Sequence, residues 1–177
     1  MCCCCRSTKS SSSDTRYIGK VYSPAEWEKR KAEVAAAESR RREIERRTVD
    51  AVNFNEPQSE RDHDFQGENT NDGYFEGRRW RAARNGWFSY RLKVNPDKPV
   101  TLVCTFRGSE GRARSFDILV DGEKVATQTL EIHPTELFDF QYRLPETLTR
   151  GKERITVKFQ AHSESIAGGL FDVRVVQ

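Results

Sequence analysis

The sequence predicts an all-β fold, an antiparallel β-sandwich of jelly-roll, galactose-binding-like type, preceded by one N-terminal α-helix. Two observations predict it. From Val49 onward, apolar residues recur at every second position in short segments that are typical of half-buried strands. Gly, Pro and Asp residues separate these segments as turns. Strands with one apolar face bury it when two sheets pack together, and 177 residues suffice for one such core plus an extension.

The helix is predicted from the segment "YSPAEWEKRKAEVAAAESRRREIERRTVD", which precedes the strands. Ser23 suits the N-cap, Pro24 suits the first helical position, and Glu26 completes a capping box. Pairs of opposite charge at i,i+4 support a helix that runs to about Arg47. Its apolar stripe is thin, so we expect the helix to lie along another surface rather than to form a core. The stripe consists of Trp27, Val34, Ala37 and Ile44.

Composition divides the chain into a disordered Cys- and Ser-rich start (1–15), a connector with the charged helix (16–47) and the β-sandwich domain (48–177). The consecutive Cys2 to Cys5 are spaced too closely for usual zinc ligands, and only their S-acylation would predict contact with a membrane. No signal peptide is recognised, so the chain is expected to be cytoplasmic as encoded. A net charge of +3, with Glu interleaved among Arg, argues against a nucleic-acid partner.

Six segments carry the alternating pattern, and one of them is a hairpin. They are "WFSYRLKV", "VTLVCTF", "FDILVDGEKVAT", "FDFQYRLP", "RITVKFQA" and "LFDVRVV". Asp121-Gly122 supplies the two-residue hairpin turn. Cys104 shares the apolar face of its segment, which predicts a buried structural thiol and not a nucleophile. The last segment is expected to bury Phe171 and to leave Asp172 and Arg174 on the outer face.

The segment "SERDHDFQGENTNDGYFEGRRW" is the longest region without a period, so it is expected to be a loop. Its carboxylate and amide oxygens suit calcium or sugar hydroxyls, and they equally suit turns and helix caps. This region and the strand after it contain the candidate substrate-binding residues. They are His63, Glu68, Asn69, Trp80, Arg81 and Trp87.

Trp87 has the parity of the solvent-facing side of its strand, opposite to Phe88 and Tyr90. A solvent-facing indole can stack on a sugar, cover a gap at the end of the sandwich or meet a second domain. The sequence leaves these three roles open. If the role is sugar binding, Arg81 and Asn69 would add directed hydrogen bonds.

No cofactor is expected except a structural calcium ion, for which Glu56 and Asp172 are the candidate ligands. The alternative is that Asp172 pairs with a neighbouring arginine on the sheet surface. The chain has no Gly-x-Ser-x-Gly, no His-Glu-x-x-His and no phosphate-cradling glycine loop. We therefore expect that it is not an enzyme.

Four segments in order also carry a family resemblance, which the upstream connector-like segment "RYIGKVYSPAEWEKRKAE" extends to about 14–177. They are "RTVDAVNFNEPQSERDHDFQGENTNDGYFEGRRWRAARNGWFSYRL", "FDILVDGEKVAT", "LPETLTRGKERITVKFQAH" and "AGGLFDVRVV". The chain resembles the C-terminal β-sandwich of glycoside hydrolases of families 127 and 146, the β-L-arabinofuranosidases. Members of that family are often periplasmic or secreted. Their zinc-bound cysteine nucleophile and glutamate acid/base belong to an (α/α) barrel, and Cys2 to Cys5 match no part of its cysteine motifs.

The resemblance therefore implies a non-catalytic substrate-binding module with arabinose-containing glycans as partners. The alternative is a structural sandwich that packs on a glycoside hydrolase catalytic barrel absent from this chain. An open groove beside the aromatic residues would favour the first function, and a flat apolar patch continuous with the helix would favour the second.

Overall fold

The computed structural model describes residues 23–177 except 109–110, 112 and 133–136. The predictions for the start at 1–15, including acylation of Cys2 to Cys5, lie outside these residues. The chain separates into a first unit that ends at Arg40 and a second unit, Arg41–Gln177, which contains every strand described.

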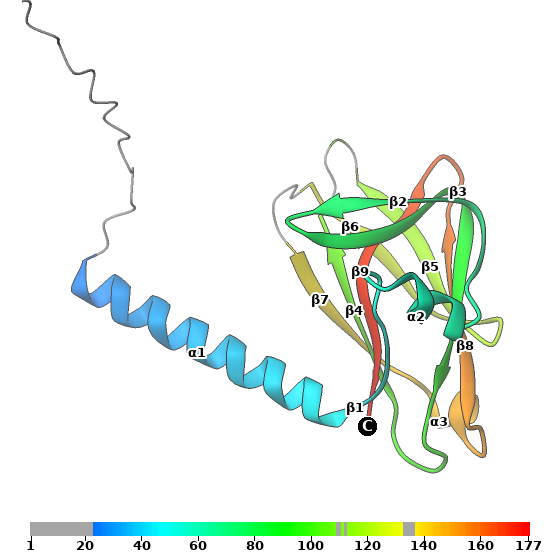
Figure 1. Cartoon of the computed structure of the whole chain (residues 1–177), viewed down its shortest axis with the longest axis horizontal. Helices are drawn as coiled ribbons and strands as arrows, with labels where there is room; N and C mark the ends of the chain where they lie inside the picture. The colour runs from blue at the N-terminus through cyan, green and yellow to red at the C-terminus, as the bar shows by residue number, and fades with distance from the viewer. Residues whose placement is uncertain (1–22, 109–110, 112, 133–136) are drawn as a thin grey trace, which may run out of the picture. The chain divides into compact units, whose positions relative to one another are not determined.

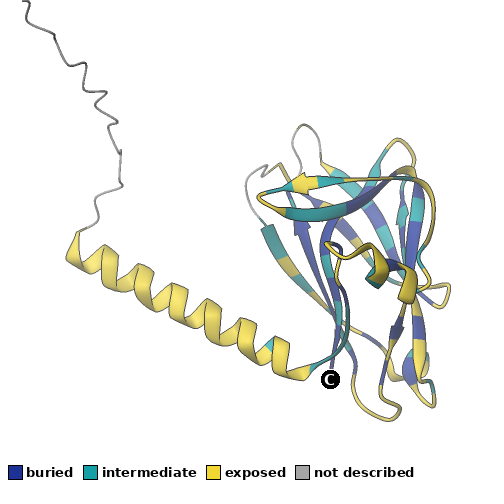
Figure 2. Ribbon diagram, in the orientation of Figure 1, coloured by how far each residue is buried: buried dark blue, intermediate teal, exposed yellow. Residues whose placement is uncertain are grey.

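The N-terminal helix α1 spans Pro24–Arg47. The capping box is present, because the Glu26 carboxylate accepts the backbone N–H of Ser23 at 2.9 Å and the Ser23 hydroxyl accepts the backbone N–H of Glu26 at 3.3 Å. No residue of α1 is buried, which agrees with its thin apolar stripe (Figure 2). Among the described residues, no helix combines the length and the apolar character needed to cross a membrane.

Antiparallel strands make up the second unit, as the sequence predicts (Figure 1). They are β1 (Thr48–Val52), β2 (Gln66–Phe75), β3 (Arg78–Lys93), β4 (Thr101–Arg107), β5 (Arg114–Val120), β6 (Glu123–Leu130), β7 (Leu137–Arg143), β8 (Arg154–Ala161) and β9 (Ile166–Val176). The pairing order is β6-β5-β8-β3-β9-β4-β7, while β1 also pairs with β9 and β2 also pairs with β3. The predicted jelly-roll sandwich is confirmed.

Strand β3 is shared by the two layers. Its residues Arg81–Arg84 pair with β9, whereas Trp87–Lys93 pair with β8 on the same edge. Strand β2 runs along the opposite edge of β3 and forms with it a long hairpin across one end of the sandwich (Figure 1). Strand β9 is shared in a similar way, because β1 and β3 follow one another along one of its edges.

The core lies between the layers and contains the residues that alternation predicts. Phe88, Tyr90 and Cys104 are fully buried in it, and in Figure 2 the buried residues lie along the strands. Burial raises the pKa of the Cys104 thiol well above its usual value, which suits an unreactive structural residue. At the β5–β6 hairpin, Asp121 and Gly122 both have positive φ, 49° and 89°, as a type I′ turn requires.

One expectation about the fold is wrong. The expected loop at 59–80 is largely regular, because it includes most of α2 (Pro57–Asp62), all of β2 and the start of β3. Strand β2 escaped detection because none of its residues is buried, so it shows no apolar alternation. Among the described strands it pairs only with β3. Phe171 is buried, as alternation predicts, and it packs against Phe75 with ring centroids 6.3 Å apart. A short helix, α3 (Glu146–Thr149), precedes β8.

Candidate functional site

A buried ion-pair cluster lies beneath α2, and we call it the Glu60 cluster: Glu60, Asp72, Arg79, Arg81 and Tyr90. The carboxylate of Glu60 is 6% exposed and accepts from Arg81 Nη2 at 2.6 Å, from Arg81 Nε at 3.0 Å and from the Tyr90 hydroxyl at 2.8 Å. Arg79 Nε donates to Asp72 at 2.9 Å. Two arginines and two carboxylates therefore balance one another, and Asp72, at 39% exposed, lies at the outer edge of the cluster.

Arg81, predicted to bind substrate, belongs to this cluster and is 7% exposed. Burial opposes its charge, but the hydrogen bonds and the charge of Glu60 outweigh burial and leave the pKa of Arg81 raised. Its guanidinium also lies over the Phe65 ring, 4.6 Å from the centroid. These contacts fasten α2 to β3, so the structure gives Arg81 a structural role.

His63 is held just after α2 by two acceptors. Nδ1 lies 2.6 Å from the Ser59 carbonyl oxygen, and Nε2 lies 3.1 Å from Asp50 Oδ1. The other oxygen of Asp50 accepts the backbone N–H of Lys93 at 2.6 Å. The imidazole thus joins α2 to β1 and β3 instead of facing an open groove.

Trp87 and Glu68 meet directly, because they are opposite one another in the β2–β3 pairing. The indole N–H of Trp87 donates to the Glu68 carboxylate at 3.2 Å. The ring is half-buried, and Lys158 Nζ lies 4.3 Å from its centroid. An ammonium group therefore lies over one face of the indole. Asn69 has φ 53° and falls at the irregularity in this pairing.

Trp80 lies elsewhere on the hairpin and does not share a surface with Arg81, since adjacent residues of a strand face opposite sides. It is opposite Gly73, where a Cβ would come within 2.6 Å of the indole. The absence of a side chain at Gly73 lets the ring lie across β2. The structure thus brings Trp87, Glu68 and Asn69 together and separates Trp80, Arg81 and His63 from them.

The sandwich has a pocket of about 210 Å³ that sequence reasoning missed, and we call it the arginine pocket. It is lined by Ala51, Val52, Asn53, Phe54, Asn55, Arg78, Arg79, Phe171, Asp172 and Arg174. The register explains its position: β1 pairs with β9 up to Val173, and β3 resumes the pairing at Leu170. On that edge Phe171 and Asp172 lie between the two pairings, where the sheet leaves an opening.

Asp172 in this pocket is bound by an arginine. Its carboxylate accepts from Arg174 Nε at 2.7 Å and also from Nη2. Burial raises the pKa of Asp172, and the charges of Arg174 and Arg78 oppose that rise without cancelling it. The pairing with Arg174 is the alternative that the sequence left open.

The proposed calcium ligands do not fit calcium. The Asp172 carboxylate is bound to the guanidinium of Arg174 and also interacts electrostatically with that of Arg78, so it is a poor ligand for a cation. Glu56 is exposed at the N-cap position of α2. In the part of the chain that the structure describes, no three His, Cys, Asp or Glu side chains are grouped to hold a metal ion.

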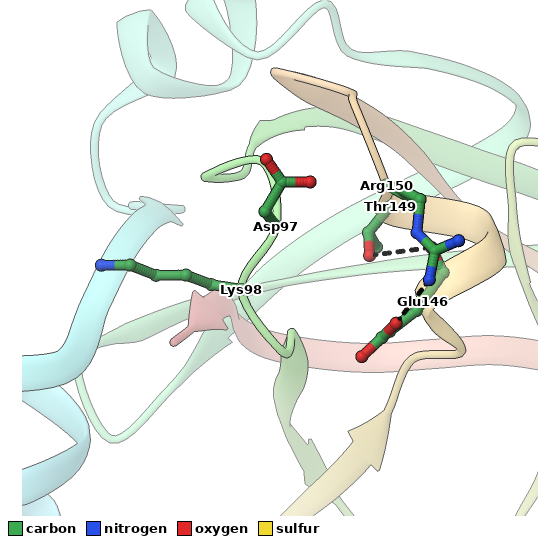
Figure 3. A pocket seen from close by; sticks show the side chains of 5 residues that line it. All are labelled: Asp97, Lys98, Glu146, Thr149 and Arg150. Carbon is green, nitrogen blue, oxygen red and sulfur yellow. Dashed lines mark hydrogen bonds and ion pairs between the residues drawn. The ribbon is translucent and has the colours of Figure 1, made fainter.

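A second pocket, of about 230 Å³, lies between the β3–β4 loop and α3 (Figure 3). Asp97, Lys98, Glu146, Thr149 and Arg150 line it. Arg150 is paired with Glu146 at 2.9 Å, and the Lys98 side chain extends away from α3. Two acids and two bases balance one another here, and no aromatic ring lines the pocket. The arginine pocket is therefore the better candidate.

Comparison with known proteins agrees with the fold. Residues 43–176 match one family model, described as a family of unknown function, DUF6805. No curated protein matches the chain. A family 35 carbohydrate binding module from Clostridium thermocellum is similar with a TM-score of 0.55 and 12% identity, over 73% of this chain and 100% of that one. An exo-beta-1,3-galactanase from Phanerochaete chrysosporium, solved with beta-1,3-galactotriose, gives a TM-score of 0.52 and 10% identity, over 71% of this chain and 28% of that one. At such identities the similarity shows a shared fold alone.

Proposed function

The chain belongs to DUF6805, a family of unknown function, and from this premise we propose that it is a non-catalytic carbohydrate-binding module. In this proposal it corresponds to the C-terminal substrate-binding sandwich of β-L-arabinofuranosidase-type glycoside hydrolases, and its ligands are arabinose-containing glycans. The arginine pocket is the proposed site, in place of the edge around Trp80, Arg81 and Trp87.

The observation that carries this proposal is the chemistry of the arginine pocket. Guanidinium and amide groups from Arg78, Arg174, Asn53 and Asn55 surround an opening beside the Phe171 ring. A few convergent polar groups next to an aromatic surface are what a sugar requires, since its hydroxyls need directed partners and its C–H face needs an apolar one. A fold shared with a carbohydrate-binding module supports the proposal.

Glycan-array screening, followed by calorimetry with arabinose-containing oligosaccharides, tests this function. We expect binding that Asn55→Ala weakens and that a matched exposed change, Asn95→Ala in the β3–β4 loop, leaves unchanged. No hydrolysis of an aryl β-L-arabinofuranoside is expected, because no catalytic motif was found in the sequence. A protein that binds no glycan on the array would overturn the proposal.

The second candidate is a structural sandwich that packs on a catalytic (α/α) barrel. It is favoured by α1, where Trp27 and Val34 are 55% and 51% exposed and lie seven residues apart, on one helix face. Co-elution with a separately produced family 127 catalytic barrel would support it, provided that Val34→Asp abolishes the co-elution. Glu38→Asp on the same helix is the control.

A further inference from the structure

We propose that the arginine pocket binds an acidic sugar residue whose oxyanion, a carboxylate or a sulfate, pairs with Arg78. This inference rests on the proposed function and names the ligand class of the same pocket.

The charges around the pocket cancel except at Arg78. Arg79 belongs to the neutral Glu60 cluster, and Arg174 is paired with Asp172. Arg78 forms no ion pair with a carboxylate of the residues that the structure describes. A ligand that brings one negative charge would complete the balance.

The neutral groups of the pocket also call for an acceptor. The amide oxygen of Asn53 accepts the backbone N–H of Asn55 at 3.1 Å, and that of Asn55 accepts the backbone N–H of Arg79 at 2.9 Å. Each oxygen therefore already accepts one hydrogen bond, and each amide nitrogen offers two N–H donors. Asp172, the one carboxylate of the pocket, is engaged by Arg174. A donor-rich pocket selects a ligand rich in acceptors.

Arg78 is held in a geometry that suits such a ligand. Its guanidinium lies over the Phe171 ring, 5.6 Å from the centroid, and Phe171 is itself 5% exposed. Stacking on a fixed ring orients the planar group while its edge N–H donors remain available for a bidentate contact. The ordering cost of the side chain is thereby reduced before the ligand arrives.

The size of the pocket limits the ligand to one residue. Its volume of about 210 Å³ is below the roughly 300–1,000 Å³ typical of sites for drug-sized ligands. We therefore expect recognition of a single acidic residue, at a chain end or beside arabinose in a branched glycan.

Calorimetry on the full chain with matched sugars tests this inference. The pairs are galacturonic acid with galactose and glucuronic acid with glucose, and galactose 6-sulfate forms a third arm. We expect each uronic acid to bind about tenfold or more tightly than its neutral partner, with an affinity that falls as salt is added. Similar binding of the sulfated sugar would identify a general oxyanion site, and its failure would identify planar carboxylate recognition.

Arg78→Gln should abolish the preference for the acidic over the neutral sugar. Arg78→Lys should keep part of it, because lysine retains the positive charge but cannot make the bidentate contact of a guanidinium. Arg91→Gln removes the same charge from an exposed position of β3 and should leave the preference for acidic sugars unchanged. If Arg78→Gln does not fold, the unmodified protein still tests the inference, because its affinity for the uronic acids should fall as salt is added. Equal affinity for acidic and neutral sugars would overturn this inference and leave the proposed function standing. Failure of every sugar, neutral and acidic, would overturn both.

Discussion

The two sides of β3 carry arginines in opposite surroundings. Arg79, which also reaches the edge of the arginine pocket, and Arg81 belong to the Glu60 cluster, where the carboxylates of Asp72 and Glu60 hold both guanidinium groups. Arg78, one residue earlier, faces the arginine pocket, where an aromatic ring is its neighbour and no described carboxylate pairs with it. The same residue type thus fastens the fold on one side and remains available to a ligand on the other. An arginine that is buried and paired with a carboxylate stabilises the fold, whereas one without such a pair can bind a ligand.

The largest expected effect on stability is at the centre of the Glu60 cluster. Glu60→Ala leaves the buried guanidinium of Arg81 without its main partner, which should cost about 3–5 kcal/mol of unfolding free energy. Urea denaturation measures this. Glu56→Ala, at the exposed start of α2, should stay within about 0.5 kcal/mol of the parent. A Glu60 variant as stable as the Glu56 variant would remove the structural role from this side of β3.

A smaller loss is expected at His63. His63→Ala removes contacts to the Ser59 carbonyl and to Asp50 while both acceptors stay partly buried, at a cost of about 1–3 kcal/mol. Thermal unfolding measures this loss, with Asp62→Ala at the exposed last residue of α2 as its control. Wild-type glycan binding by the folded variant would agree with a structural role, whereas lost binding with an unchanged midpoint would restore His63 as a ligand contact.

Trp87→Ala should cost less, about 1–2 kcal/mol, because the ring is half-buried and loses one hydrogen bond and one contact with Lys158. Trp87→Phe keeps the ring and tests the N–H alone. Glycan binding should survive both changes if the arginine pocket is the site. A folded Trp87→Ala protein that no longer retains the glycan would instead place the site at Trp87 and Glu68.

The smallest expected effect is a loss of stability at acidic pH, which results from protonation of Asp72. The hydrogen bond from Arg79 lowers the pKa of Asp72 below its usual value of 3.8. A lowered folded-state pKa gives stability that is present above the unfolded value and is lost as pH falls through the folded one. Melting curves from about pH 5 to about pH 3 should therefore fall more steeply for the parent than for Asp72→Asn. Parallel curves would contradict a stabilising pair.

The alternation of apolar and polar residues predicted those strands in which one face is buried and therefore apolar. Phe88, Tyr90 and Cys104 were placed in the core because a half-buried strand repeats every two residues. Strand β2 was missed because an edge strand with no buried residue has no such repeat. The capping signals of α1 were also readable, since Ser23 and Glu26 bond within one turn.

The site was less predictable, because it depends on contacts between distant segments. Nothing local to Arg81 indicates that Glu60 will lie beneath it, 21 positions away. Parity did place Asp172 and Arg174 on the outer face, which was the one signal for the arginine pocket. The opening itself arises where β1 and β3 divide one edge of β9, and this register is not visible in the sequence.

The polar composition of β2 also affects how copies of this protein meet. Of the described strands, β2 pairs only with β3, so its other edge presents unpaired backbone groups that could template aggregation. Its side chains are Gln, Glu, Asn and Asp at most exposed positions, and the irregularity between Glu68 and Thr70 breaks its straight course. Charge and bending both discourage strand addition by a neighbour. The features that hid this strand from sequence analysis thus favour solubility at high concentration.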